Sequence, residues 1–239
     1  MDVIRVGVTG VGHELPELRG DVAVEWVEIP TLRYEAIDWP RGIQEGLIAK
    51  PFDWIIFSSR RSLSFFSDFL KKANREFPVE SQIACIGEST ARFAEEQGWF
   101  SDFYPTESGS EGFLKEFEDL ISNNRIKPRV FMPSALNGRR LIADRLRELG
   151  CEVCLVPIYQ GLRINPEDSA SSLALVNGCD ALILTSPTQA EAFLDYYPLR
   201  SETRLIAMGD FTNDHLRTRG FEKVISLPNS DFSRLGEIL

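Results

Sequence analysis

The chain has 239 residues, of which 43% are hydrophobic, an ordinary fraction for a folded globular protein. Its formal net charge of −10 argues against a nucleic-acid-binding surface, which needs a basic stripe. No apolar run approaches the roughly 18 residues of a membrane span. Because the N-terminal residues also do not resemble a signal peptide, we expect a cytoplasmic protein.

Apolar runs rich in Ile and Val alternate along the chain with patterns of helical period. The predicted strands are Ile4–Thr9, Val22–Ile29, Trp54–Ser58, Gln82–Ile86, Phe100–Tyr104, Arg129–Met132, Glu152–Val156, Ala181–Thr185, Arg204–Ala207 and Lys223–Ser226. The predicted helices are Arg61–Ala73, Ser89–Gln97, Glu111–Ile121, Arg139–Leu149, Pro187–Tyr196 and Phe211–Arg219. Strands that alternate with helices indicate an α/β fold of parallel sheets flanked by helices. Several of the helices are expected to end at a glycine, namely Gly98, Gly150 and Gly220.

Two sequence elements occur twice. The segment 53–59 (DWIIFSS) returns at 180–186 (DALILTS), so that Ser59 and Ser186 lie 127 residues apart. The segment 83–90 (IACIGEST) returns at 205–212 (LIAMGDFT). An internal repeat predicts two similar α/β lobes.

Two segments extend a strand past a proline with no helix between, at 30–35 and 157–163. They occupy equivalent positions in the repeat, which favours two crossings between lobes, paired as an antiparallel ladder. We therefore expect one lobe at 38–156 and a discontinuous lobe made of 1–30 and 164–239. Residues 31–37 and 157–163 would form the hinge.

A Cys-x-x-Cys spacing at Cys151 and Cys154 suggests a redox or zinc site. The segment is predicted to be a strand, however, and residues three apart on a strand point to opposite faces. Buried, reduced thiols are therefore expected, with no metal and no cofactor. The sequence also lacks a P-loop, a Gly-x-Ser-x-Gly motif and a complete dinucleotide fingerprint.

Serine, threonine and glycine residues recur where a predicted strand is followed by a helix. Helix N-termini present free N–H groups and the positive end of a dipole, which suit carboxylates or phosphates. Serine and threonine are also common helix caps, and glycine eases tight turns, so a structural role is the alternative. Arg60, Arg61, Arg139 and Arg140 also lie at such junctions and are candidates for binding anions. The candidate binding residues are Ser59, Arg60, Gly87, Thr90, Arg139, Ser186, Thr188, Gly209 and Thr212.

Tyr159 is the candidate for chemistry. It lies in a predicted hinge crossing, where its phenol can serve as a proton donor. Packing on the sheet with the hydroxyl at the surface is the structural alternative.

The ordered set of motifs resembles uroporphyrinogen-III synthase. That family has a strand ending in Thr-Ser or Ser-Ser before a helix, then Ile-Gly-x-x-Thr-Ala, both duplicated. Between the copies comes Gly-Arg-x-x-Leu…Leu-x-x-x-Gly-x-x-Val…Pro-x-Tyr. In this chain the central stretch runs from Gly138 through Gly150 to Tyr159. The resemblance covers roughly residues 50 to 225, and only the complete set in this order is specific.

The resemblance implies a lyase that binds hydroxymethylbilane between two lobes and closes it to uroporphyrinogen III with inversion of ring D. It implies no metal or organic cofactor. Ser59, Thr90, Ser186 and Thr212 match residues that line the family's cleft, and Tyr159 matches the tyrosine usually proposed to assist hydroxide departure. We expect a monomer with a linear tetrapyrrole as its small-molecule substrate, and no membrane partner.

The chain departs from the family pattern in several places, mostly in the lobe that contains the N-terminus. The first strand ends in Thr9-Gly10-Val11, where the family has Thr-Arg-Pro, and a short segment, His13–Arg19, replaces the usual helix. Asp210, beside a candidate anion site, would repel carboxylates. A family-like tetrapyrrole-binding or regulatory protein without turnover is therefore the alternative function. A periplasmic-type sensor also fits two lobes, but the predicted absence of a signal peptide counts against it.

Overall fold

A computed structural model describes residues 3–10, 15, 23–39, 51–74, 80–123, 127–165, 176–197, 199–227, 235–236 and 238–239. The segment His13–Arg19 lies outside these residues except for Leu15, and so does Val22. The chain divides into two compact units. Unit 1 comprises Met1–Arg33 and Leu162–Leu239, and unit 2 comprises Tyr34–Gly161.

The sheet that unit 2 carries has the strand order β3-β7-β6-β4-β5. Its strands are β3 (Leu32–Ala36), β4 (Trp54–Phe57), β5 (Gln82–Cys85), β6 (Arg129–Ala135) and β7 (Glu152–Arg163). Its helices are α2 (Arg60–Lys72), α3 (Glu88–Glu96), α4 (Ser110–Asn123) and α5 (Leu141–Glu148). The ladders from β5 to β7 are parallel, as predicted for an α/β fold.

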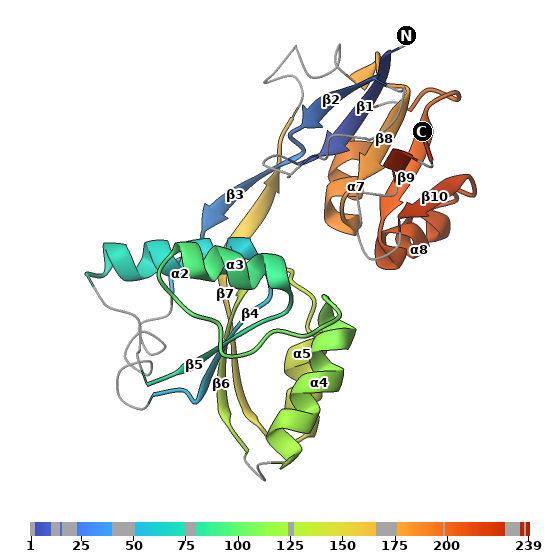
Figure 1. Ribbon diagram of the computed structural model, residues 1–239. Coiled ribbons are helices and arrows are strands. Elements are labelled where there is room, and N and C mark those ends of the chain that lie inside the picture. Colours follow the sequence, from blue (N-terminus) through green and yellow to red (C-terminus); the bar gives the residue numbers. More distant parts are fainter. Residues whose placement is uncertain are drawn as a thin grey trace. The chain divides into compact units, whose positions relative to one another are not determined.

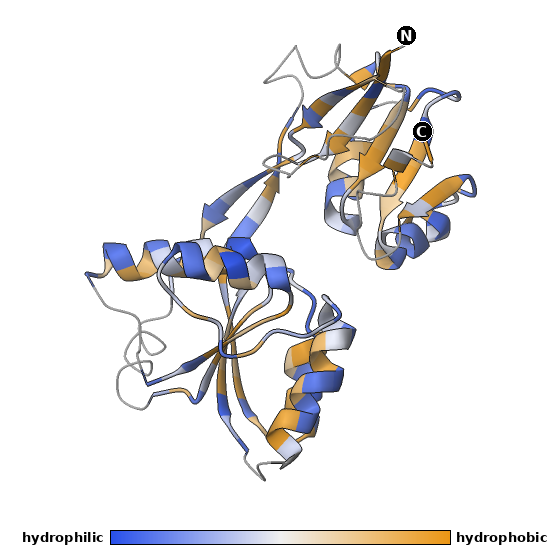
Figure 2. Ribbon diagram, viewed as in Figure 1, coloured by the Kyte–Doolittle hydropathy of each residue, from blue (hydrophilic) through white to orange (hydrophobic). Residues whose placement is uncertain are grey.

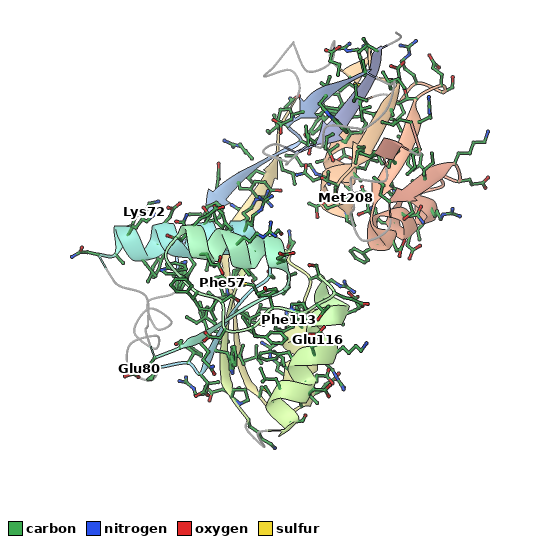
Figure 3. All side chains as sticks on the ribbon, viewed as in Figure 1. Phe57, Lys72, Glu80, Phe113, Glu116 and Met208 are labelled. Atoms are coloured by element: carbon green, nitrogen blue, oxygen red, sulfur yellow. The ribbon has the colours of Figure 1, made fainter. Side chains whose placement is uncertain are left out.

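Alternate residues of each central strand enter two different cores, because successive side chains of a strand point to opposite faces. Ile55 and Phe57 pack with α2 and α3, whereas Trp54 and Ile56 pack with α4 and α5. Figure 1 shows these helix pairs on the two faces of the sheet, and in Figure 2 the helices have polar outer surfaces. Phe57 and Phe113 lie inside the unit, whereas Lys72 lies on its outside (Figure 3).

Unit 1 has the strand order β10-β9-β8-β1-β2. Its strands are β1 (Val3–Thr9), β2 (Ala23–Ile29), β8 (Ala181–Leu184), β9 (Arg204–Met208) and β10 (Val224–Leu227), all in parallel ladders. Helices α7 (Pro187–Leu194) and α8 (Asp210–Thr218) contribute Ala190, Phe193 and Leu216 to one core with Leu182 and Leu184. The coarse prediction, parallel sheets flanked by helices, is confirmed.

Corresponding strands hold corresponding places in the two sheets. The order β9-β8-β1-β2 in unit 1 matches β5-β4-β6-β7 in unit 2, so that the N-terminal strands occupy the places of β6 and β7. Beside β9 unit 1 has β10, and at the equivalent place unit 2 has only a single bridge from Phe103 to Ala84. The predicted strand Phe100–Tyr104 is therefore wrong. Phe100 is 78% exposed, and Pro105 has no backbone N–H to continue the pairing beyond Phe103 and Tyr104.

The two segments predicted as crossings lie in neighbouring strands. Ile37 N donates to Ile158 O and Ile164 N donates to Thr31 O, so residue numbers fall along β7 as they rise along β3, the pattern of antiparallel pairing. The role of these strands as a hinge stays a prediction.

Glycines end the helices as predicted. Gly98, Gly150 and Gly220 have φ of +80°, +86° and +89°, a backbone region that residues other than glycine rarely adopt.

Candidate functional site

The candidate residues of unit 2 follow the carboxyl ends of its strands. Ser59 comes two residues after β4 and is the N-cap of α2, and Gly87 comes two residues after β5 and is the N-cap of α3. Because β4 and β5 are paired in parallel, both helix N-termini start at the same edge of the sheet. Tyr159 of β7 is paired with Ala135 near the carboxyl end of β6.

The equivalent junctions of unit 1 have the same construction. Ser186 is the N-cap of α7 after β8, and Gly209 is the N-cap of α8 after β9. Strands β8 and β9 are parallel neighbours, so these two N-termini also start at one edge. Thr188, in the first turn of α7, is exposed.

The serine junctions and the glycine junctions differ in how their amides are bonded. Ser59 Oγ accepts from Ser62 N at 3.1 Å, and Ser186 Oγ accepts from Gln189 N at 3.3 Å. The N-termini of α3 and α8 have no side-chain cap. Capping of their own helices therefore accounts for the hydroxyls of Ser59 and Ser186, whereas no side chain caps the first-turn amides of α3 and α8.

The charges at these helix ends also differ. Helix α2 has no acidic residue in its first turn, which instead contains Arg60 and Arg61, both exposed. In α3 the first turn contains Glu88, which forms an ion pair with Arg92 at 2.6 Å. In α8 it contains Asp210, whose carboxylate accepts from Ser226 Oγ at 3.0 Å. The dipole and local charge are therefore most favourable to an anion at α2.

Each glycine is required by its own surroundings. Gly209 has φ +80° and ψ 160°, a conformation open essentially to glycine alone. Gly87 has ordinary extended backbone, but a Cβ there would lie 2.7 Å from Ser108 Oγ. A glycine at either position is therefore no sign of ligand binding by itself.

Thr90 and Thr212 lie in the first turns of α3 and α8, as expected, but their side chains are 5% and 3% exposed. Burial within their own units leaves little hydroxyl surface for a ligand.

The expectation that Arg139 and Arg140 begin a helix is wrong. Helix α5 begins at Leu141, with Arg140 as its N-cap residue, so neither arginine lies in the first turn. Arg139 instead forms an ion pair with Glu111 of α4 at 2.7 Å, and Arg140 lies 3.6 Å from Asp144. A carboxylate ligand at Arg139 would have to compete with Glu111.

Tyr159 is 6% exposed. Its ring stacks on Phe65 of α2, with centroids 4.9 Å apart and planes inclined by 5°. Tyr34 of β3 meets it edge-on at 6.1 Å, and the guanidinium of Arg61 lies 3.6 Å from the Tyr34 centroid. Sequence reasoning missed Tyr34 and Phe65. The four-residue spacing of Arg61 and Phe65, which places both on one helix face, was a signal for Phe65 but not for Tyr34.

The four cysteines are free, and Cys151 is buried as predicted, whereas Cys154 is only partly buried. Cys151 packs in the core against α4 and α5, whereas Cys154 packs against the core on the other face of the sheet. Burial raises the pKa of both thiols, and it raises the pKa of Cys85 to about 11 despite an opposing hydrogen bond with Ser101. Protonated thiols are poor nucleophiles and poor metal ligands.

In the part of the chain that the structure describes, no three metal-binding side chains gather into a group that could hold an ion. Within the same residues, no helix has both the length and the apolar character needed to cross a bilayer.

Two solved structures share the fold. A uroporphyrinogen-III synthetase of Helicobacter pylori matches with a TM-score of 0.68, 17% identity and coverage of 98% of each chain. A mutant uroporphyrinogen III synthase of Thermus thermophilus matches with a TM-score of 0.60 and 17% identity over 98% of this chain and 95% of the other.

Sequence comparison gives relatives with concordant descriptions. A protein of Methanothermobacter thermautotrophicus, provisionally described as a uroporphyrinogen-III synthase, is 29% identical over 60% of this chain. The porphyrin biosynthesis protein HemD of Ruminiclostridium josui is 22% identical over 80% of this chain. The matched regions span 56% and 38% of those two relatives, respectively. The family model of uroporphyrinogen-III synthase HemD matches residues 17–235, and the chain therefore belongs to the uroporphyrinogen-III synthase family.

Proposed function

We propose that the protein converts hydroxymethylbilane to uroporphyrinogen III. Membership of the family supports this reaction, and the observation that carries it is the pair of helix N-termini at the carboxyl edge of each sheet. The substrate has eight carboxylates. The positive N-terminal ends of four helices can bind carboxylates locally, whereas the net charge of −10 of the chain opposes their approach.

In the proposed reaction the hydroxyl group of the substrate leaves as water after a proton is supplied to it. The resulting azafulvene cation closes the ring with inversion of ring D, through a spiro intermediate. We assign the proton donation to the Tyr159 phenol. The remaining contribution is the folding of a flexible chain into a reactive conformation and stabilisation of the cation, both of which need positioned groups rather than a covalent nucleophile.

The anion-binding residues follow from the same proposal. We place carboxylates of the substrate at α2, with Ser59 and Arg60, and at the uncapped ends of α3 and α8, with Gly87 and Gly209. Ser186 and Thr188 at α7, and Arg139, would contribute further donors. Thr90 and Thr212 would act chiefly by fixing the first turns in which they are buried.

We also propose that both units contribute to one substrate site and that residues 31–37 and 157–163 form the hinge. The protein would act as a monomer, which sedimentation at equilibrium with and without substrate would test.

The decisive experiment supplies hydroxymethylbilane to the purified protein and separates the uroporphyrinogen isomers after oxidation. Without an enzyme, ring closure gives the type I isomer. An excess of type III is the expected result. If only type I forms, the synthase assignment is wrong, and binding of the substrate without turnover would then favour the regulatory alternative.

A further inference from the structure

Tyr159 belongs to a small cluster of side chains that it forms with Tyr34, Phe65 and Arg61. Phe65 lies parallel to the Tyr159 ring and limits its tilt, with an interplanar angle of 5°. Tyr34 meets the same ring at an interplanar angle of 65° and packs against it from a second direction. Both geometries are favourable for aromatic pairs.

The fourth member, Arg61, holds Tyr34. Its guanidinium carbon lies 3.6 Å from the Tyr34 ring centroid, well inside the distance of a cation–π contact. Arg61 forms no ion pair with any described residue, although this acidic chain is rich in carboxylates. A cation in the first turn of a helix opposes the dipole, so the ring is a compensating partner for an otherwise unfavourable position.

The cluster joins one helix to two neighbouring strands, and each of these two parts contributes two side chains. Arg61 and Phe65 are four residues apart on one face of α2, whereas Tyr34 and Tyr159 belong to the neighbouring strands β3 and β7. The same helix turn therefore contacts Tyr159 directly through Phe65 and indirectly through Arg61 and Tyr34.

We infer that Tyr34 and Arg61 are positioning residues, which hold the Tyr159 phenol at the orientation needed for proton donation. This inference rests on the proposed function, because it gives the cluster a purpose only if Tyr159 donates a proton. A proton donor must be kept within hydrogen-bond distance of its acceptor, and small displacements reduce the rate strongly.

Replacement of Arg61 and Tyr34 tests the inference. Arg61→Met removes the cation but keeps a long side chain, and we expect kcat to fall about two- to five-fold, as for loss of one cation–π contact, with KM little changed. Tyr34→Leu removes both ring contacts and should lower kcat by roughly two- to ten-fold. Tyr34→Phe keeps the ring and should restore most of the rate.

Arg60→Met is the matched comparison, because it removes the same charge from the adjacent residue of α2. Because Arg60 is a proposed substrate ligand, Arg60→Met should raise KM, whereas Arg61→Met should leave KM little changed. A fall in kcat beyond that of Arg60→Met is expected only for Arg61→Met. Circular dichroism at the assay temperature shows that each variant is folded.

A double-mutant cycle gives the sharpest result. If Tyr34 acts through the Tyr159 hydroxyl, Tyr34→Leu should lower kcat in the wild type but not in the Tyr159→Phe background. Additive losses would overturn the inference, and so would a raised KM as the sole effect of Arg61→Met, which would make Arg61 a direct substrate ligand. The proposed function is judged separately, by whether the wild type forms type III isomer.

Discussion

Ser59 is the residue at which structural and functional roles can be separated most clearly. Its Oγ accepts from Ser62 N at 3.1 Å, and the Ser62 hydroxyl donates to Ser59 O at 2.8 Å. Ser62 is fully buried, so water cannot reach its amide when the cap is removed. Ser59→Ala should therefore lower the free energy of unfolding by about 1–2 kcal/mol, in the upper range for loss of an N-cap.

Thermal unfolding followed by circular dichroism measures this loss. For a chain of this size, we expect the melting temperature to fall by roughly 2–8 °C. Ser186→Ala is the matched variant in unit 1 and should cost less, because Ser186 Oγ accepts over 3.3 Å and forms no reciprocal capping box. An unchanged melting temperature in Ser59→Ala would refute the argument from the cap.

Ser59→Asp separates the role of Ser59 as a helix cap from its proposed role in substrate binding. Aspartate is as good a cap as serine, and its charge is favourable at a helix N-terminus by about 0.3–1 kcal/mol, so stability should be kept or raised. The same charge repels substrate carboxylates at α2, and KM should rise. A variant that is stable and has an unchanged KM would show that the N-terminus of α2 does not receive the substrate.

Four further predictions follow from single residues. Tyr159→Phe should lower turnover in the isomer assay while its melting curve stays that of a folded protein, and an unchanged rate would remove the phenol from the mechanism. Gly209→Ala should lower the free energy of unfolding by about 1–3 kcal/mol, measured by urea denaturation, because φ +80° with ψ 160° strains any residue with a Cβ. Gly87→Ala should also destabilise, but a second change, Ser108→Gly, should restore stability because it removes the atoms 2.7 and 2.9 Å from the new Cβ. Burial raises the pKa of Cys85 from 9.0 to about 11, so the unfolded chain loses this proton first. The resulting stability is fully present below pH 9 and is lost as pH rises through about 11, an effect that the unfolding curves of Cys85→Ala should lack.

Most of the fold could be predicted because its signals are local. Runs such as Trp54–Phe57 and Ala181–Leu184 are apolar at every position, as strands buried on both faces must be. Ser59 and Ser186 mark helix starts through bonds that reach only three residues along the chain. The error at Phe100–Tyr104 arose because strand formation there depends on pairing with β5, and that pairing is confined to Asp102 and Phe103.

The candidate site was predictable in position but not in its contacts. The junctions Ser59, Gly87, Ser186 and Gly209 are all helix N-caps at carboxyl edges of strands, which follows from strand-to-helix order alone. That Arg139 is paired with Glu111, 28 residues away, could not be read from either residue.

Taken by itself, the sequence determined most of the strands and helices, the glycine turns after them and the family, since each depends on a few neighbouring residues or on their order. Only the tertiary structure decided that Gly87 must be a glycine, because the obstructing atoms belong to Ser108. It also decided that Tyr34 and Phe65 contact the Tyr159 ring and that Arg61 packs on Tyr34. These contacts join α2, β3 and β7, and no pattern within one segment specifies which side chains of another will meet it once the chain has folded.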